Sequence, residues 1–214
     1  MRKILTIDCW NTLIKPSGDK ERIIYNIAKH IGVPYAQLWE AVEYVKVETR
    51  QIQHTESNYM FWFRVRNRLN LSISTPRLLK IAAESYNTYK PQVINLQMWN
   101  EVIRKAIDRG YDVRILSNTG YIKSDWLEKY FGKTLGVATP IPVVGSDLVG
   151  AAKPELEFYR RALDCNYSPE EDRWIHIGDS VKLNIEPVTA MGGTTILFTG
   201  WDTFDGIDLD ALFT

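Results

Sequence analysis

The sequence predicts an α/β protein in which helices cover a parallel sheet, with an all-helical domain inserted after the first strand. Short apolar runs rich in β-branched residues alternate with helical patterns along most of the chain, as in folds built on parallel strands with right-handed crossovers. Between residues 16 and 93 this alternation stops and only helical patterns remain. A chain of 214 residues is long enough for one such domain and a sizeable insertion.

Five runs in the alternating part are predicted to be strands. Four are short, apolar and rich in β-branched residues, as buried parallel strands are, and the fifth matches this pattern less well. The four are residues 3–8, 111–117, 173–179 and 193–198, and the fifth is 140–146. Helices are predicted at 95–110, 123–131 and 154–163, with Gly110 suited to a helix end and Pro154 to a first helical position. Residues 200–214 show no clear period and are assigned no element.

The insertion contains four helical patterns, at 20–32, 34–53, 58–70 and 75–90. We therefore predict two domains, a core formed by residues 1–15 and 94–214 and a smaller helical domain formed by residues 16–93.

Charge and composition narrow the range of partners. Lys and Arg number 26, as do Asp and Glu, so the formal net charge is zero and no long-range field favours nucleic acid or an anionic membrane. No run approaches the ~20 apolar residues that span a bilayer. The two cysteines, Cys9 and Cys165, are expected to be free buried thiols. Nucleic acid and membranes are therefore not expected as partners, the cytoplasm is the expected location, and the oligomeric state stays open.

Polar residues follow several of the predicted strands, where ligands bind in open α/β sheets. Asp8 ends the first strand, Ser117 and Asn118 end the second, and Asp179 follows the strand that begins at residue 173. Lys153 lies in the loop before a predicted helix. Each residue alone is a weak signal, since a single Asp at a strand end is more often a turn or helix cap. Their order and spacing together indicate a site.

Four segments carrying these residues resemble the motifs of the haloacid dehalogenase (HAD) superfamily. They are ILTIDCWNTL (4–13), ILSNTG (115–120), AAKPELEFY (151–159) and IHIGDSVKLNIEPVTAMG (175–192), and the match extends from residue 3 to about 198. The resemblance implies a Rossmann-like core. The place of the insertion is similar to that of the helical C1-type cap of subfamily I.

The resemblance also implies roles for individual residues. The nucleophile would be Asp8, with Ser117 and Lys153 completing the catalytic set. A carboxylate nucleophile divides one hard displacement into two easier steps through a covalent intermediate. A Mg²⁺ ion would offset the repulsion between the acids and an anionic substrate. Its ligands would be Asp8, the Trp10 main-chain carbonyl, Asp179 and Asn184, and the substrate would contact Ser117, Asn118, Lys153 and Trp10.

Trp10 departs from the pattern of the family's phosphatases, which usually carry a second Asp at this place. Indole cannot act as an acid–base catalyst near neutral pH, and losing such catalysis typically costs about 10²–10⁴ in rate. Alkyl phosphate monoesters are therefore expected to be poor substrates unless another group substitutes. His54, in the insertion, is one candidate, although such a histidine is more often a surface residue.

Three functions are compatible with these residues. A Mg²⁺-dependent phosphohydrolase acting on a small phosphorylated metabolite is the favoured one, because Asp179 in a Gly-Asp-Ser sequence suits a divalent cation. The second is a metal-independent dehalogenase that attacks carbon and expels halide, a class with an aromatic residue at the position of Trp10. The third is a protein that binds a phosphorylated ligand without turning it over.

Overall fold

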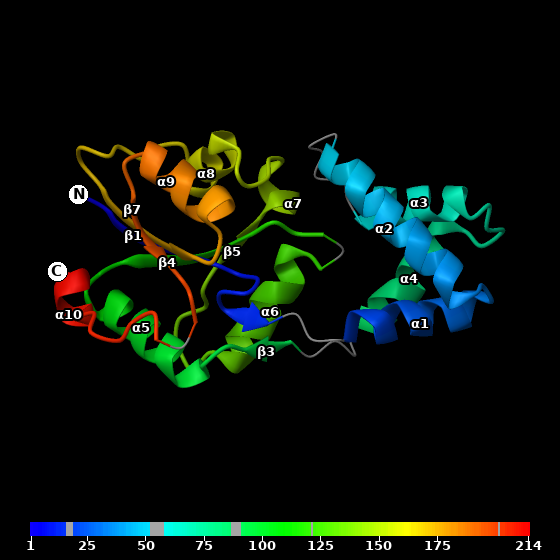
Figure 1. The fold of residues 1–214 in the computed structure, drawn as a ribbon, viewed down its shortest axis with the longest axis horizontal. Helices are drawn as coiled ribbons and strands as arrows, with labels where there is room; N and C mark the ends of the chain where they lie inside the picture. The colour runs from blue at the N-terminus through cyan, green and yellow to red at the C-terminus, as the bar shows by residue number, and fades with distance from the viewer. Residues whose placement is uncertain (16–18, 52–57, 87–90, 121, 201) are drawn as a thin grey trace. The chain divides into compact units, whose positions relative to one another are not determined.

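The computed structural model describes residues 1–15, 19–51, 58–86, 91–120, 122–200 and 202–214. The chain divides into two compact units (Figure 1). The core unit comprises Met1–Lys15, Val93–Thr119 and Lys123–Thr214, and the helical unit comprises Pro16–Gln92 and Gly120–Ile122. Within the described residues, every helix is too short or too polar to cross a lipid bilayer.

The core unit is built on a five-stranded sheet in the order β5-β4-β1-β6-β7, with every neighbouring pair parallel. The predicted α/β class with a parallel sheet is therefore confirmed. The order reverses between β1 and β6, which is the switch point where open α/β sheets bind ligands. The strands are β1 (Lys3–Asp8), β4 (Asp112–Ser117), β5 (Val143–Gly145), β6 (Arg173–Gly178) and β7 (Thr194–Leu197).

The fifth predicted strand is shorter than expected. β5 begins at Val143 rather than at residue 140. Pro140 and Pro142 have no N–H to donate to a neighbouring strand, so they cannot take part fully in the sheet. The carbonyl of Pro142 still accepts a hydrogen bond from the Ile115 N–H at 2.9 Å, which guides the chain into β5.

Helices connect and cover these strands. Figure 1 shows α8 and α9 on one face of the sheet and α5 and α10 on the other. The Asn95 side chain caps α5 by accepting from the Met98 N–H at 3.2 Å, and Gly110 follows the helix with a positive φ of 79°. The helices are α5 (Leu96–Asp108), α6 (Ser124–Thr134), α7 (Ser146–Val149), α8 (Leu156–Ala162), the π-helical turn η1 (Val181–Ile185), α9 (Glu186–Ala190) and α10 (Leu209–Leu212).

Two expectations for the core unit need correction. α8 begins at Leu156, so Pro154 lies two residues before the helix instead of in its first turn. Both cysteines are free, as expected, and Cys9 is buried, but Cys165 is exposed. It lies beyond the end of α8 with a positive φ of 57°, and this turn faces away from the core.

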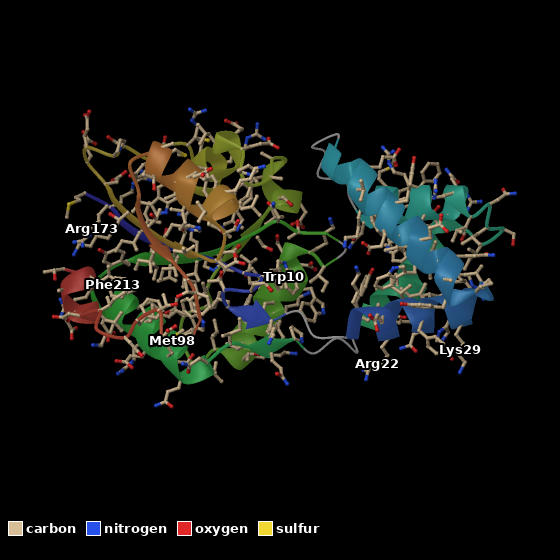
Figure 2. All side chains as sticks on the ribbon, viewed as in Figure 1. Trp10, Arg22, Lys29, Met98, Arg173 and Phe213 are labelled. Atoms are coloured by element: carbon tan, nitrogen blue, oxygen red, sulfur yellow. The ribbon has the colours of Figure 1, made fainter. Side chains whose placement is uncertain are left out.

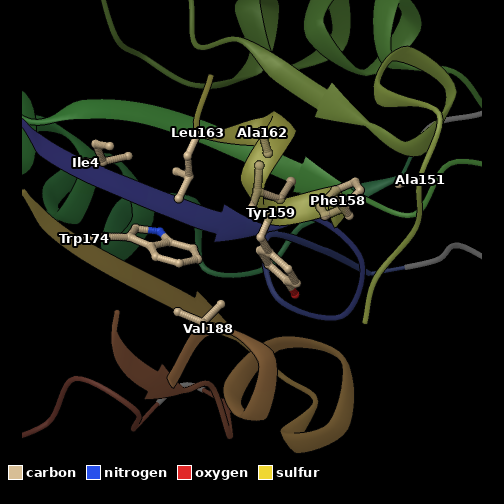
Figure 3. Packing of buried hydrophobic residues seen from close by; sticks show 9 residues of the cluster. Ile4, Ala151, Phe158, Tyr159, Ala162, Leu163, Trp174 and Val188 are labelled. Atoms are coloured by element: carbon tan, nitrogen blue, oxygen red, sulfur yellow. The ribbon is translucent and has the colours of Figure 1, made fainter. Parts of the chain in front are cut away.

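Packing between the sheet and α8 fixes where the strand ends lie. Trp174 of β6 and Tyr159 of α8 are fully buried, with ring centroids 5.9 Å apart, and Ile4 of β1 belongs to the same cluster (Figure 3). The Trp174 indole N–H donates to Thr6 Oγ1 at 2.7 Å, which joins β6 to β1. These contacts hold the two strands in register and so position the residues that end them.

The helical unit contains α1 (Asp19–Ile31), α2 (Tyr35–Gln51), α3 (Asn58–Arg68) and α4 (Thr75–Tyr86). The predicted helix ends at 52–53 and 87–90 lie outside the described residues. The interior is apolar, with Trp62 and Leu78 fully buried, whereas Arg22 and Lys29 project outward from α1 (Figure 2). Arg68 lies over the Tyr44 ring, 3.5 Å from its centroid. The unit thus has a core of its own.

A short two-stranded ribbon lies where the chain leaves and re-enters the core unit. It pairs β2 (Ile14–Lys15) with β3 (Gln92–Val93), and the Ile94 N–H donates to the Leu13 carbonyl at 2.8 Å. Two residues are too few to produce a period in the sequence, so no pattern predicted these strands.

Candidate active site

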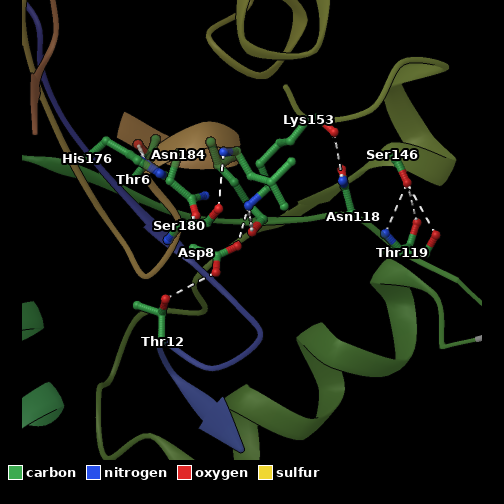
Figure 4. Close-up of polar contacts among 12 residues, drawn as sticks. Thr6, Asp8, Thr12, Asn118, Thr119, Ser146, Lys153, His176, Ser180 and Asn184 are labelled. Carbon is green, nitrogen blue, oxygen red and sulfur yellow. Dashed lines mark hydrogen bonds and ion pairs between the residues drawn. The ribbon is translucent and has the colours of Figure 1, made fainter. Parts of the chain in front are cut away.

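A buried ion pair joins the ends of two segments that are 145 residues apart. Asp8 ends β1 and is 6% exposed, and Lys153, in the loop before α8, is 5% exposed. The Lys153 ammonium donates to Asp8 Oδ1 and also to the Leu116 carbonyl at 3.1 Å. Thr12 Oγ1 donates to the other oxygen, Asp8 Oδ2, at 3.1 Å (Figure 4). Both carboxylate oxygens of Asp8 are therefore held by donors from this chain.

A second carboxyl group approaches the first. Asp179 directly follows β6, the strand next to β1, and is half-buried. Burial raises the pKa of the Asp179 carboxyl above its ordinary value, and the charge of the Asp8 carboxylate raises it further. The positive charge of Lys153 acts in the opposite direction. The switch point of the sheet thus gathers two acids and one amine.

The turn that carries Asp179 is stabilised by Asn184. Asn184 Oδ1 accepts from the Ser180 N–H at 3.1 Å, and Ser180 Oγ accepts from the Leu183 N–H at 3.2 Å. Asn184 is only 1% exposed, and its Nδ2 has no hydrogen-bond partner among the described residues. A Cβ at Gly178 would lie 2.5 Å from Asn184 Cγ, so only glycine leaves room for this amide.

Asn118 and Lys153 hold each other's segments. Asn118 Nδ2 donates to the Lys153 carbonyl at 2.9 Å, and the Lys153 N–H donates to Asn118 Oδ1 at 2.8 Å. Both polar ends of the Asn118 side chain are therefore engaged, which leaves its main chain as the part available to a ligand. Ser117 is fully buried, and its Oγ has no hydrogen-bond partner among the described residues.

Trp10 lies in the tight turn that follows Asp8. The Cys9 carbonyl accepts from the N–H groups of Leu13 and Ile14, and Asn11 has a positive φ of 61°. This turn brings Thr12 back toward Asp8 and keeps the Trp10 main chain beside the nucleophile candidate. The Trp10 side chain is half-buried. It places an indole, with no carboxyl group, two residues after Asp8.

His176 lies inside β6 and is a fully buried core group. Its Nδ1 lies 2.7 Å from Thr6 Oγ1, and its Nε2 has no hydrogen-bond partner in the described part of the chain. Burial lowers the pKa of the imidazole well below its ordinary value, and the charge of Lys153 lowers it further. The ring is therefore neutral near pH 7. His54 lies outside the described residues.

Several solved structures share this arrangement of strands and helices. A 2-haloacid dehalogenase from Pseudomonas syringae pv. Tomato DC3000 matches with a TM-score of 0.62 and 18% identity, over 94% of this chain and 90% of that chain. An HAD family enzyme from Bacteroides thetaiotaomicron, in complex with magnesium and inorganic phosphate, matches with a TM-score of 0.63 and 20% identity, over 97% and 100%. An HAD phosphatase from Thermococcus onnurineus matches with a TM-score of 0.53 and 18% identity, over 92% of this chain and 86% of that chain.

The chain has the haloacid dehalogenase-like fold. The fold expected from the four motifs is thereby confirmed, and at these identities the likeness concerns the fold alone. No protein-family model matches the sequence, and no curated protein matches it either. The residues of the site must therefore be judged by their own geometry.

The donor atoms of the candidate site suit a hard cation. Mg²⁺ is bound by oxygen ligands, usually one or two carboxylates together with substrate oxygens and water. Asp8 and Asp179 supply carboxyl groups from the ends of neighbouring strands, and the Trp10 carbonyl and the Asn184 amide are further oxygen donors. Among the described residues no group of three or more His, Cys, Asp or Glu side chains converges on one point. Because the candidate donors are all oxygens, the set fits Mg²⁺ better than a metal that needs nitrogen or sulfur ligands.

A cavity elsewhere in the core unit is separate from this site. It has a volume of about 850 Å³ and runs along α5, where Leu96, Asn100 and Arg104 are among its lining residues. None of the strand-end residues described above lines it. The chemistry-bearing side chains gather instead at the carboxyl ends of β1, β4 and β6.

Proposed function

We propose that this chain is a Mg²⁺-dependent phosphohydrolase that acts on a small phosphorylated metabolite through a covalent phosphoryl intermediate on Asp8. The observation that carries the proposal is the approach of the Asp8 and Asp179 carboxyl groups beside the buried Lys153 ammonium. Two acids this close need a cation when both are ionised. A phosphoryl group needs the same positive charge around it.

In the proposed reaction, a carboxylate oxygen of Asp8 attacks phosphorus and the bond to the leaving oxygen breaks. The leaving group departs with that electron pair. Water then attacks the phosphoryl-aspartate, inorganic phosphate is released, a proton passes to solvent, and the Asp8 carboxylate is regenerated. Thr12 and Lys153 orient the Asp8 oxygens by the hydrogen bonds described above, which keeps the nucleophile in one position before substrate arrives.

The phosphoryl oxygens would be bound by donors from three segments. Lys153 supplies a positive charge, Ser117 a buried hydroxyl without a partner in the described residues, and Asn118 its main chain. When bound, Mg²⁺ would neutralise the two acids and polarise the phosphoryl group. Asp8, Asp179 and the Trp10 carbonyl are its proposed ligands. Asn184 Oδ1 already accepts from Ser180, so it has one lone pair left for the ion.

Trp10 restricts the leaving group. Because no carboxylic acid follows Asp8 at this place, the leaving oxygen must depart unprotonated. Acyl and aryl phosphates meet this condition and alkyl phosphates do not. Hydrolysis of the phosphoryl-aspartate lacks the same acid–base group, so we expect the second step to be slower than the first. A burst of product should therefore precede steady turnover of p-nitrophenyl phosphate.

The helical unit is proposed to be the cap of this enzyme, spanning residues 16–93. Specificity for the organic part of the metabolite would then reside in its side chains. Two of its arginines already have partners, since Arg64 lies 3.4 Å from Glu48 and Arg68 stacks on Tyr44. A role for them in substrate binding would require these contacts to be exchanged.

The test is hydrolysis of acetyl phosphate and p-nitrophenyl phosphate with Mg²⁺ and with EDTA. We expect metal-dependent turnover. Asp8→Asn should lower it by at least about 10³-fold, because replacing a catalytic nucleophile typically lowers kcat by this much or more. Asp112→Asn is the matched control, because this exposed acid begins β4 and pairs with Arg114. Undiminished turnover by Asp8→Asn would refute the nucleophile, and lack of turnover on every phosphate would favour a non-catalytic phospho-ligand binder.

A second pair of variants tests the restriction on leaving groups. Trp10→Asp restores a carboxyl group two residues after Asp8, and Trp10→Phe keeps an aromatic ring without one. If a proton donor is what the site lacks, aryl and alkyl phosphates should converge in rate for Trp10→Asp only. An unchanged ratio between the two substrates would show that the leaving group is limited by something else.

Dehalogenation is the second candidate function. Two observations favour it: the aromatic Trp10 beside Asp8, and the likeness in fold to a 2-haloacid dehalogenase. In this reaction Asp8 attacks carbon and expels halide, and no metal is required. Release of chloride from 2-chloropropionate in EDTA would establish this function in place of the phosphohydrolase.

A further inference from the structure

A cluster of hydrogen-bonding side chains lies beside the candidate active site, at the carboxyl ends of β4 and β5. It joins Thr119, two residues after Ser117, to Ser124 at the start of α6 and to Ser146 and Asp147 at the start of α7. We call these four residues, Thr119, Ser124, Ser146 and Asp147, the Asp147 cluster. None of the roles proposed above uses it.

The Asp147 carboxylate binds both Thr119 and Ser124. Asp147 Oδ1 accepts from Thr119 Oγ1 at 2.7 Å and from Ser124 Oγ at 2.6 Å. The Asp147 N–H donates in turn to Thr119 Oγ1 at 3.0 Å. The Thr119 N–H donates to Ser146 Oγ, also at 3.0 Å. Thr119 and Ser124 are therefore both held by side chains from one short helix, α7.

The cluster is closed against the end of β5 by a glycine. A Cβ at Gly145 would lie 2.2 Å from Ser124 Oγ and 2.5 Å from both Asp147 Oδ1 and Thr119 Cγ2. The φ of Gly145 is −103°, a value open to any residue, so the requirement is for space alone. Any larger residue would push the three side chains apart.

Thr119 directly follows Ser117 and Asn118, the residues of the proposed phosphoryl site. Asn118 is bound on one side to the main chain of Lys153, and the next residue, Thr119, is bound on the other side to the Asp147 cluster. Figure 4 shows Asn118 between the Asp8–Lys153 pair and the contact of Thr119 with Ser146. The main chain that carries Ser117 and Asn118 is thus held from both flanks.

We propose that Asp147 is a positioning residue for the phosphoryl-binding segment. By holding Thr119 and Ser124, it fixes the main chain from which Ser117 and Asn118 present donors to the transferring group. The inference rests on the proposed function. Asp147 acts through Thr119 and touches neither the nucleophile nor the substrate. Misplacement by about 1 Å can cost 10²-fold in rate, so a holding contact of this kind has a measurable effect.

The experiment compares kcat and KM on acetyl phosphate for three variants of the whole chain. Asp147→Ala is expected to lower kcat about 10–100-fold with a smaller change in KM. Asp147→Asn should recover activity to within about fivefold, because its amide oxygen can accept both hydroxyl groups. Asp172→Ala is the matched control: this buried carboxylate binds Arg2 and the Ser168 N–H, and it precedes β6, at the opposite end of the sheet from the site.

Amide hydrogen exchange supplies a readout that does not depend on turnover. In Asp147→Ala the Thr119 and Ser124 amides should exchange faster than in the wild type, and in Asp172→Ala they should not. Unchanged exchange at both amides, or wild-type kcat in Asp147→Ala, would overturn the proposal. An equal fall in kcat in Asp147→Ala and Asp172→Ala would also overturn it, because the loss would then reflect a general effect on the fold and not the position of the phosphoryl-binding segment. Wild-type protein that turns over no phosphate would refute the proposed function instead.

Two further variants keep the proposal testable if Asp147→Ala does not fold. Thr119→Val keeps the shape of the side chain and removes the hydroxyl that Asp147 binds. Gly145→Ala removes no polar group and forces the cluster open. Each should lower kcat in the same way as Asp147→Ala, and wild-type kcat in both would contradict the assignment.

Discussion

Asp8 ends β1 and Asp179 directly follows the neighbouring strand β6, so the two carboxyl groups come together at the point where the order of the sheet reverses. Burial is the first cause of the raised pKa of Asp179, and the charge of Asp8 is the second. Lys153 offsets part of this repulsion through its ion pair with Asp8. Asp179 is therefore an acid that resists ionisation.

The first prediction concerns stability and pH. The folded-state pKa of Asp179 is raised above its ordinary value of 3.8. Burying this carboxyl group therefore costs no folding free energy below pH 3.8, and the cost develops as the pH rises through the folded-state pKa. Asp179→Asn should therefore raise the melting temperature at pH 7 in EDTA by about 2 °C, a size suited to a half-exposed group. At pH 3 the variant and the wild type should melt alike.

Thermal unfolding followed by circular dichroism checks this prediction. Added Mg²⁺ should stabilise the wild type and leave Asp179→Asn unchanged. The matched control is Asp125→Asn, an exposed acid of α6 whose partner is Lys129 at 3.9 Å. A melting temperature lower than wild type for Asp179→Asn in EDTA would show that the two acids do not repel in the folded protein.

The second prediction concerns the buried ion pair. Lys153→Met leaves the Asp8 carboxylate buried without its cation, and breaking such a pair costs about 3–5 kcal/mol. Lys105→Met is the control, because Lys105 pairs with Asp210 at 2.9 Å near the surface and such pairs contribute about 1 kcal/mol or less. Urea denaturation of the two variants should separate these losses. Equal losses would mean that Lys153 does not neutralise Asp8.

The third prediction concerns Gly178. Alanine here places a methyl group 2.5 Å from Asn184 Cγ, which must move and release Ser180. We expect a loss of about 1–3 kcal/mol in the free energy of unfolding, together with weaker Mg²⁺ binding measured by calorimetry. Gly132→Ala, in α6 with no atom within 4 Å of the added methyl, should instead stabilise by about 0.5–1 kcal/mol. Unaltered Mg²⁺ binding by Gly178→Ala would separate Asn184 from the metal site.

The central strands were predictable because burial on both faces makes their sequences continuously apolar. β1, for example, begins and ends at the predicted residues 3 and 8. α10 could not be predicted in the same way, because distant residues hold it. Asp210 of this helix pairs with Lys105 and Arg109 of the α5 region, and Phe213 packs on Tyr111 with centroids 5.2 Å apart.

The strand-end residues of the site could be chosen from the sequence because parallel strands bring their carboxyl ends together. Asp8 and Asp179 come together for that reason, since they lie at the ends of the neighbouring strands β1 and β6. Lys153 lies in the loop before α8 and was chosen because its segment resembles a family motif. The Asp147 cluster could not be found this way. Its members are short hydroxyl and acid side chains separated by up to 28 residues, and such residues are common in any turn.

The ribbon of β2 and β3 brings the two ends of the insertion side by side. A segment whose ends are neighbours can be lengthened, shortened or exchanged during evolution without altering the order of the five parallel strands. The helical unit can therefore change while the strand ends that carry Asp8 and Asp179 stay intact. The same junction is where an engineer would cut to graft a different helical unit onto this sheet.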